Sequence, residues 1–323
     1  MKKLLLFVFV FAALSSCDDG DLIVENINFD DVALQRCTTN NYLLYKIAGS
    51  ECLILYLPQD GAFLNETTGS MPRTYSISST NRVVYRNFNG NIGSGAICDI
   101  IPPASPTVQE EWLAQSGTIE ITTTLVISDN PNLPGGERIT GYRHAVVLKN
   151  VDFLKPNGTS QFYSTFNLGN FTSPNSTTYP FAFAQDATLC GGNRVFNYIN
   201  SEALTLDIDI NLIENAETPI GNPRIGYTGS ATNRLSYRLF ANAPLSSDYF
   251  CTTPPPLLPV VTEEWLADAG DAADQTGIIE VITTTSGPGV FLHEIRLKNV
   301  RLRKGNSSFI LATNYLLGYL ITS

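Results

Sequence analysis

The chain has 323 residues, enough for two domains of ordinary size, and 43% of them are hydrophobic, which excludes the disordered class. Only 15% of the residues are charged, and the formal net charge is -10 at pH 7. A nucleic-acid binder needs a basic face to neutralise phosphates, so this charge removes nucleic acid from the expected partners.

The N-terminus carries the features of a secretory signal. Two lysines precede an apolar stretch at residues 4–14, which is about half the length that a bilayer-spanning helix needs. The string LSSC that ends at Cys17 resembles the lipobox of bacterial lipoproteins. That resemblance implies that residues 1–16 are a signal peptide and that Cys17 becomes the N-terminus, carrying acyl chains such as palmitate. The lipid bilayer is therefore the first expected partner.

An acidic tether follows the cysteine. Residues 18–21 read DDGD, which is similar to the acidic signal that directs lipoproteins of Bacteroidota to the outer surface. The resemblance implies a lipid anchor in the outer membrane at residues 17–21, with the body of the protein facing the cell exterior. The periplasmic face stays open as the alternative.

The rest of the chain contains a long self-match. The segment EEWLA occurs twice, HAVVLKNV matches HEIRLKNV, and NRVVYR matches NRLSYR. The only two tryptophans, Trp112 and Trp265, fall at equivalent positions, and so do the only two histidines, His144 and His293. A match of this length predicts an internal duplication.

The duplication predicts two domains of similar size. The first is expected at residues 22–172 and the second at residues 179–323. Residues 173–178, rich in Ser, Thr, Asn and Pro, are the expected linker. Each half has its own tryptophan and about 150 residues, so each is expected to fold alone. Residues 128–140 form an insertion in the first copy and are expected to be a loop.

Strand patterns dominate both copies. Residues 205–212 alternate between apolar and polar side chains, and residues 52–57 and 118–126 are β-branched or apolar runs of strand length. One helical turn per copy is expected at residues 110–114 and 263–267, where acidic residues follow a proline-containing run. The sequence therefore predicts an all-β protein of two tandem, internally duplicated β-sandwich domains with one short helical turn each.

The remaining five cysteines show a repeated spacing. Cys37 and Cys98 are 61 residues apart, and so are Cys190 and Cys251. Disulfides persist outside the cytoplasm, so these two pairs are the predicted disulfides, each stabilising the fold by roughly 4 kcal/mol. Cys52 is expected to be a small buried hydrophobe. Pairing of Cys37 with Cys52 stays open, because spacing does not fix connectivity.

Candidate sites for chemistry are few. His144 and His293 share a strand face with apolar residues, which predicts hydrogen-bonded histidines at the edge of each core. The acidic loop that holds Asp268, Asp271 and Asp274 is the candidate calcium site, although its spacing does not match the twelve-residue calcium loop. No hydrolase, zinc or nucleotide-binding signature occurs, so neither catalytic residues nor a cofactor are predicted.

These observations favour a membrane-anchored, surface-exposed binding or adhesion module for glycan or protein, without enzymatic activity. Amide and hydroxyl groups hydrogen-bond sugars, and aromatic rings stack on them. Two alternatives stay open: a glycan hydrolase that uses loop carboxylates, and a purely structural envelope protein. The aromatic residues considered for a sugar platform, with core packing as the alternative role for each, are Tyr163, Phe166, Phe171, Tyr315 and Tyr319.

Overall fold

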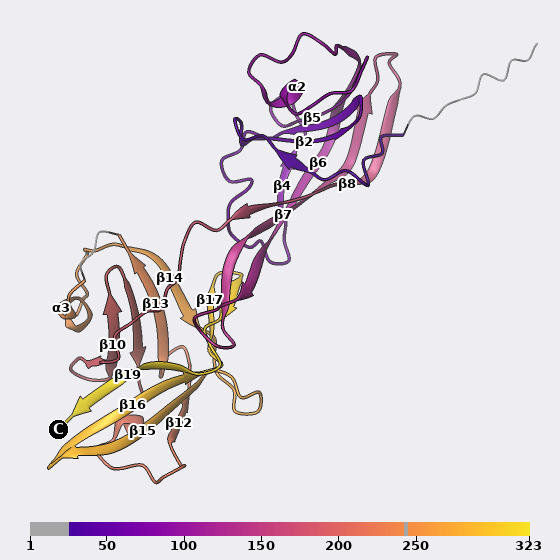
Figure 1. The fold of residues 1–323 in the computed structure, drawn as a ribbon. Coiled ribbons are helices and arrows are strands. Elements are labelled where there is room, and N and C mark those ends of the chain that lie inside the picture. Colours follow the sequence, from indigo (N-terminus) through magenta and orange to yellow (C-terminus); the bar gives the residue numbers. More distant parts are fainter. Residues whose placement is uncertain (1–25, 242–244) are drawn as a thin grey trace, which may run out of the picture.

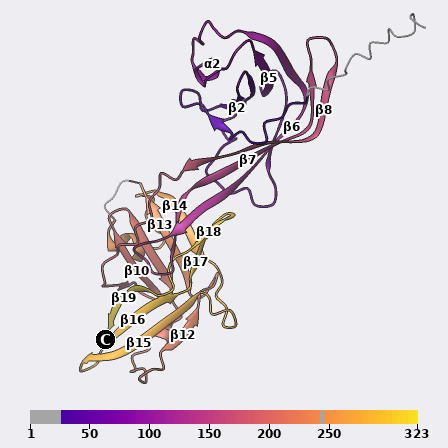
Figure 2. The same ribbon diagram turned by 45° about the vertical axis from the view of Figure 1, so that its right-hand side comes forward.

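The computed structural model describes residues 26–241 and 245–323, which form two β-rich lobes joined by long strands (Figures 1 and 2). The strands pair antiparallel throughout the named elements, and within the described residues two short helices and one 3-10 turn interrupt them. The all-β prediction is confirmed. The predictions for the signal peptide, Cys17 and the acidic tether lie outside the described residues.

The N-terminal lobe is built on one eight-stranded sheet in the order β1-β2-β3-β5-β6-β7-β8, with β4 paired to β6. The long strand β6 pairs with β5 through its first residues and with β4 further on, so the sheet curls over itself. Its strands are β1 (Gln35–Arg36), β2 (Leu43–Ala48), β3 (Glu51–Tyr56), β4 (Arg73–Ser76), β5 (Arg82–Phe88), β6 (Val108–Asp129), β7 (Glu137–Leu154) and β8 (Ser160–Pro174).

A glycine allows β6 to change partners. Gly117 lies between the two halves of β6 with φ of 130°, and a Cβ atom there would lie 2.9 Å from Val151 Cα. Only glycine adopts this backbone while leaving room for the neighbouring strand. Register shifts on both sides of Ser116 mark the same bend.

The C-terminal lobe contains two sheets, in the orders β18-β17-β14-β13-β11-β10-β9 and β12-β15-β16-β19. Buried residues of both sheets pack into a single hydrophobic core around Trp265. The first sheet has strands β9 (Thr188–Leu189), β10 (Arg194–Ile199), β11 (Glu202–Asp207), β13 (Arg234–Phe240), β14 (Val261–Ala267), β17 (Arg301–Lys304) and β18 (Ser307–Ile310). The second has β12 (Arg224–Tyr227), β15 (Ile278–Gly287), β16 (Val290–Lys298) and β19 (Tyr315–Thr322).

The predicted helical turns at residues 110–114 and 263–267 are wrong. These segments lie in β6 and β14, where Trp112 and Trp265 are each 1% exposed and face the core. Cross-strand pairing of the two segments with β5 and β13 outweighs the weak helical signal of their acidic residues. Each lobe does contain one short helix, α2 (Gly95–Cys98) and α3 (Ser247–Cys251), directly before the proline-containing run.

Two element boundaries also differ from the prediction. The alternating run at residues 205–212 is strand only as far as Asp207, and a 3-10 turn, η1 (Ile210–Ile213), follows. The side chain of Asp209 accepts from the Asn211 backbone N–H and thereby ends the strand pattern. Strand β8 reaches Pro174, so the first two residues of the predicted linker belong to the sheet.

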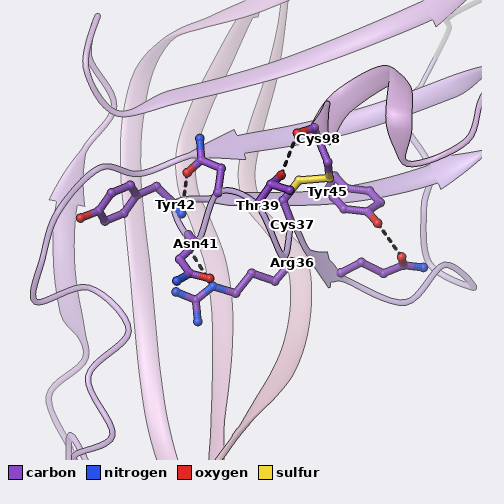
Figure 3. Close-up of a disulfide and its surroundings, with 9 residues drawn as sticks. Arg36, Cys37, Thr39, Asn41, Tyr42, Tyr45 and Cys98 are labelled. Carbon is purple, nitrogen blue, oxygen red and sulfur yellow. Dashed lines mark hydrogen bonds between the residues drawn. A yellow bond between two sulfur atoms is a disulfide. The ribbon is translucent and has the colours of Figure 1, made fainter. Parts of the chain in front are cut away.

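Both predicted disulfides are present. Cys37 pairs with Cys98 and Cys190 with Cys251, with Cα–Cα distances of 5.5 and 5.1 Å. The first ties α2 to the chain after β1, beside the hydrogen bond from Thr39 Oγ1 to the Cys98 carbonyl (Figure 3). Cys52 is free and buried, and burial raises the pKa of its thiol to about 12. The alternative pairing of Cys37 with Cys52 is therefore wrong.

The insertion at residues 128–140 extends the β6–β7 hairpin instead of forming a free loop. This hairpin runs from the N-terminal lobe onto the C-terminal lobe (Figures 1 and 2). Ile139 and Tyr142 are buried in the core of the C-terminal lobe. A Cβ atom at Gly136 would lie 2.3 Å from the Leu311 carbonyl oxygen, so glycine permits the close approach of the two backbones.

Within residues 26–241 and 245–323, no helix is long and apolar enough to span a membrane.

Candidate functional site

The two histidines are the buried centres of hydrogen-bonded chains of side chains. In the N-terminal lobe His144, on β7, has no exposed surface. Its Nδ1 lies 2.9 Å from Thr123 Oγ1 on β6, and its Nε2 lies 2.9 Å from Ser173 Oγ on β8. Arg73 Nη1 donates to Thr123 Oγ1 over 2.9 Å, and Ser173 Oγ donates to Asn65 Oδ1. We call these five side chains the N-terminal relay.

The chemistry of these groups fixes the direction of the protons. Ser173 Oγ donates its one proton to Asn65 Oδ1, so towards His144 it can only accept. Nε2 of His144 therefore carries the ring proton and donates it to Ser173. A serine nucleophile needs the opposite arrangement, in which Nε2 accepts the hydroxyl proton. The Ser173–His144 pair is therefore not a nucleophile with its base.

The C-terminal lobe contains the same chain of contacts. His293 lies 2.8 Å from Thr283 Oγ1 through Nδ1 and 2.8 Å from Thr322 Oγ1 through Nε2. Arg224 Nη1 donates to Thr283 Oγ1 over 2.8 Å, and Thr322 Oγ1 donates to Asn215 Oδ1. In both lobes the arginine also binds a backbone carbonyl of the loop that holds the asparagine. The relays thus fasten one loop to four strands.

Burial keeps both rings neutral. It lowers the pKa of His144 to about 4, and the charges of Arg73 and Arg36 act in the same direction. Burial, with Arg224 as the second cause, also lowers the pKa of His293. A neutral imidazole with both nitrogens hydrogen-bonded has no site left for substrate or metal. The prediction that both histidines are hydrogen-bonded is confirmed.

A second set of contacts recurs in both lobes around the tryptophans. Trp112 Nε1 donates to Glu110 over 2.6 Å, and Trp265 Nε1 donates to Glu263 over 3.1 Å. Lysines lie over the rings, Lys155 Nζ at 4.1 Å from the Trp112 centroid and Lys304 Nζ at 5.8 Å from that of Trp265. Glu110 and Glu263 are therefore each held by a tryptophan of the lobe that contains them.

Two of the three carboxylates of the candidate calcium loop have other partners. Asp268 binds Arg303 through two hydrogen bonds, of 2.7 and 2.9 Å. Asp271 accepts backbone N–H groups from Ala273 and Asp274, as in a turn of the acidic loop. Across the described residues, no three His, Cys, Asp or Glu side chains are grouped so that they could hold a metal ion.

The aromatic residues considered for a sugar platform pack into the lobes. Phe171 stacks on His144 with centroids 4.9 Å apart, and Tyr163 contacts both Phe153 and Phe166. Tyr315 is 7% exposed, and its hydroxyl donates to the Phe181 carbonyl. Tyr319, which is half-buried, pairs with Glu294 along β19. Core packing therefore accounts for the first four, and no exposed platform is formed by these side chains.

A groove of about 460 Å³ lies instead at the junction of the two lobes, and we call it the junction groove. Its walls come from the tip of the β6–β7 hairpin, the segment after β8, and Phe309 of β18. The Asn175 N–H donates to the Thr140 carbonyl, and the Ile310 N–H donates to Glu137 Oε2, which holds these walls together. Its lining is Asn130, Pro131, Asn132, Glu137, Arg138, Ile139, Thr140, Asn175, Thr177, Thr178, Tyr179, Pro180, Phe181 and Phe309.

The chemistry of the junction groove is polar with an aromatic edge. Asn132, Arg138 and Thr178 are exposed and bring amide, guanidinium and hydroxyl groups. Tyr179 is half-buried, stacks on Phe309 and donates its hydroxyl proton to Glu263. Burial and the neighbouring Glu263 raise its pKa, so the phenol stays protonated. Glu137, the one carboxylate in the lining, already accepts from the Ile310 backbone.

Sequence reasoning missed the outer members of both relays and the whole junction groove. A signal for the relays does exist: Asn65 and Asn215 are followed by Pro-Arg pairs that end at Arg73 and Arg224, at nearly the same spacing. The groove has no such signal, because its lining comes from the insertion, the linker and a distant strand.

Comparison with known proteins does not assign the chain to a family. No family model, no curated protein and no solved structure matches the chain.

Proposed function

We propose that this protein is a lipid-anchored binding or adhesion module of the bacterial outer surface, built from two copies of one β-sandwich domain, and that its junction groove takes a glycan. Different observations support the duplication, the ligand and the anchor.

The duplication is supported by contacts that recur at matching sequence positions. The relay of Arg, Thr, His, hydroxyl and Asn occurs in each lobe, as does the set of Trp, Glu and Lys. Ion pairs of Arg86 with Glu111 and of Arg238 with Glu264 match as well. Buried polar networks demand partners from several strands at once, so two unrelated folds would not repeat them in the same order.

The ligand is supported by the lining of the junction groove, and this observation carries the proposal. Exposed amide, guanidinium and hydroxyl groups donate and accept hydrogen bonds as a sugar requires, and Tyr179 offers part of an aromatic ring beside them. A volume of about 460 Å³ lies in the usual range of ligand sites. The groove holds no pair of unengaged carboxylates, so binding without turnover fits it better than hydrolysis.

The ligand is tested by screening the chain on a glycan array. We expect Asn132→Ala with Arg138→Ala to reduce binding of the selected glycan about tenfold or more, because two hydrogen-bonding groups are lost. Arg143→Ala is the matched control, an exposed arginine on β7 outside the lining, and it should bind as the parent does. Equal loss in the control and the groove variant would refute the site.

A protein partner is favoured by a different observation. The loops after α2 and α3 each present two adjacent apolar residues, with Ile100 and Ile101 96% and 85% exposed and Leu257 and Leu258 93% and 71% exposed. Exposed apolar pairs in the corresponding loop of each lobe are typical of contact with another protein. These loops lie outside the lining of the junction groove, so a protein partner and a glycan would use different surfaces.

The lipid anchor is supported by the sequence around Cys17. Cys17→Ala should move the protein from the membrane fraction to the soluble fraction, because no acyl chain can then be attached. Fractionation of cells followed by immunoblotting measures this, with Cys52→Ala as the control that keeps the anchor. A Cys17→Ala protein that still sediments with membranes would contradict the lipoprotein assignment.

A further inference from the structure

A second pocket lies on the outer face of the N-terminal lobe, away from the junction groove and independent of the function proposed for it. It has a volume of about 360 Å³ and sits on β2, β3 and β5, beside α2. The Cys37–Cys98 disulfide fastens α2 at this place (Figure 3). We call it the sheet-face pocket, and it is lined by Asn40, Leu43, Ile54, Tyr56, Arg82, Val84, Arg86 and Ile97.

The floor of the sheet-face pocket is apolar. Ile54 and Val84 are paired across β3 and β5 and share the outer face of the sheet. Leu43 and Ile97 continue the apolar surface and are half-buried. A floor of this kind favours a hydrocarbon or aromatic body, since burying it removes apolar surface from water.

The rim of the pocket carries positive charge. Arg86 is neutralised by Glu111 at 2.6 Å, but Arg82 has a different environment. Its guanidinium lies 5.2 Å from the ring centroid of Tyr56, the residue paired with it across the strands. Among the described residues, no carboxylate forms an ion pair with Arg82. An exposed arginine that no carboxylate neutralises can pair with an anion bound over the apolar floor.

On the corresponding face of the C-terminal sheet, side chains of the protein itself cover the surface. Arg234, the counterpart of Arg82, pairs across the strands with Asp207, but the Asp207 carboxylate binds Arg194 instead, at 2.7 Å. The counterparts of Ile54 and Val84 are Thr205 and Ser236, which hydrogen-bond to each other over 2.7 Å.

An aromatic cluster covers this face as well. Phe250 directly precedes the disulfide cysteine, as Ile97 does in the N-terminal lobe, and it stacks on Phe196 with centroids 4.7 Å apart. The C-terminal lobe thus covers this face with a ring and with polar side chains that bind one another. The N-terminal lobe has the smaller Ile97 at the position of Phe250.

We infer that the sheet-face pocket binds a small carboxylate with an apolar body, such as an arylalkanoic acid. The carboxylate pairs with Arg82, and the body covers Ile54 and Val84 beside Ile97. The body takes the space that the larger ring of Phe250 fills in the C-terminal lobe. The charge selects the ligand, because the neutral amide of the same acid offers no ion pair to Arg82.

The test compares 3-phenylpropionate with 3-phenylpropionamide, titrated into the purified chain and followed by ligand-detected NMR. We expect the carboxylate to bind about tenfold more tightly than the amide, as for a hydrogen bond to a charged group. Arg82→Gln should abolish this preference while leaving amide binding unchanged. Ile97→Phe should weaken both ligands about tenfold, because the ring fills the pocket as Phe250 does in the C-terminal lobe.

The matched control is Arg234→Gln, which should leave both dissociation constants unchanged. Circular dichroism shows whether each variant keeps the parent fold, and the exposed position of Arg82 leads us to expect that it does. Three results would overturn the inference: no binding of 3-phenylpropionate at millimolar concentration, equal affinity of acid and amide for the parent, or binding only of a peptide that ends in phenylalanine. None of these results bears on the junction groove, since the two pockets share no residue.

Discussion

Ile139→Ala is expected to destabilise the C-terminal lobe by about 2–5 kcal/mol, although Ile139 lies on a strand of the N-terminal sheet. The reason is that Ile139 is buried in the core of the C-terminal lobe, next to residues of its two sheets. Tyr142, on the same strand, belongs to that core too. The β6–β7 hairpin therefore forms part of the hydrophobic core of the C-terminal lobe.

The two tryptophans allow each lobe to be followed separately in the full chain. Trp112→Phe leaves Trp265 as the reporter of the C-terminal lobe, and Trp265→Phe leaves Trp112 for the N-terminal lobe. Urea unfolding followed by fluorescence should show that Ile139→Ala shifts the transition reported by Trp265. Ile127→Ala, which changes the 44% exposed partner of Ile139 across the hairpin, should cost less than about 1 kcal/mol.

An unchanged Trp265 transition in the Ile139→Ala chain would show that the hairpin does not stabilise the C-terminal lobe.

The contact of the hairpin with the C-terminal core also changes the stability expected for each half expressed alone. A fragment that begins at residue 179 lacks Ile139 and Tyr142, so we expect it to be less stable than the lobe in the full chain.

The stability of the protein should fall as the pH drops from about 6.5 to about 4. Burial lowers the pKa of His144 to about 4, so the folded chain keeps this ring neutral where the unfolded chain protonates it. The unfolded state then binds more protons, and stability is lost towards low pH. One such ring accounts for about 3 kcal/mol over this range, and His293 acts in the same direction.

Urea unfolding at a series of pH values measures this effect. Burial raises the pKa of Glu202, which acts with the opposite sign, so a comparison between variants is needed. His144→Gln should lower stability at pH 7, because the relay loses its ring, and should flatten the slope between pH 6.5 and 4. A slope that stays the same in His144→Gln would show that the histidine does not titrate on unfolding.

Patterns repeated within the chain allowed the strongest predictions. The spacing of 61 between Cys37 and Cys98, seen again between Cys190 and Cys251, predicted both disulfides correctly. Alternating apolar residues predicted a β protein, because side chains of a half-buried strand point to opposite faces in turn. The two-copy organisation stays a prediction that the recurring relays support.

The errors arose where tertiary pairing overrides local signals. The segment around Trp112 reads as a helix start because of its two glutamates, yet one glutamate binds the tryptophan and the other binds Arg86. Neither contact is visible in a local pattern. The insertion at residues 128–140 reads as a loop because of its Gly, Pro and Asn residues, but these occupy only the hairpin tip.

The candidate sites could not be predicted for a related reason. Each relay joins side chains from four strands and one loop, and the junction groove joins three segments that are far apart in the chain. Residue type alone predicted a calcium site in the acidic loop, but the Asp268 carboxylate there binds Arg303.

The most direct test of the central claim is calorimetric titration of the array-selected glycan into the full chain, followed by mass analysis of the recovered glycan. We predict saturable one-site binding, about tenfold or more weaker binding to the Asn132→Ala, Arg138→Ala chain, and recovery of the glycan at its original mass. Unchanged affinity in that variant, or release of shorter saccharides by the parent chain, would contradict a junction groove that binds glycan without cleaving it.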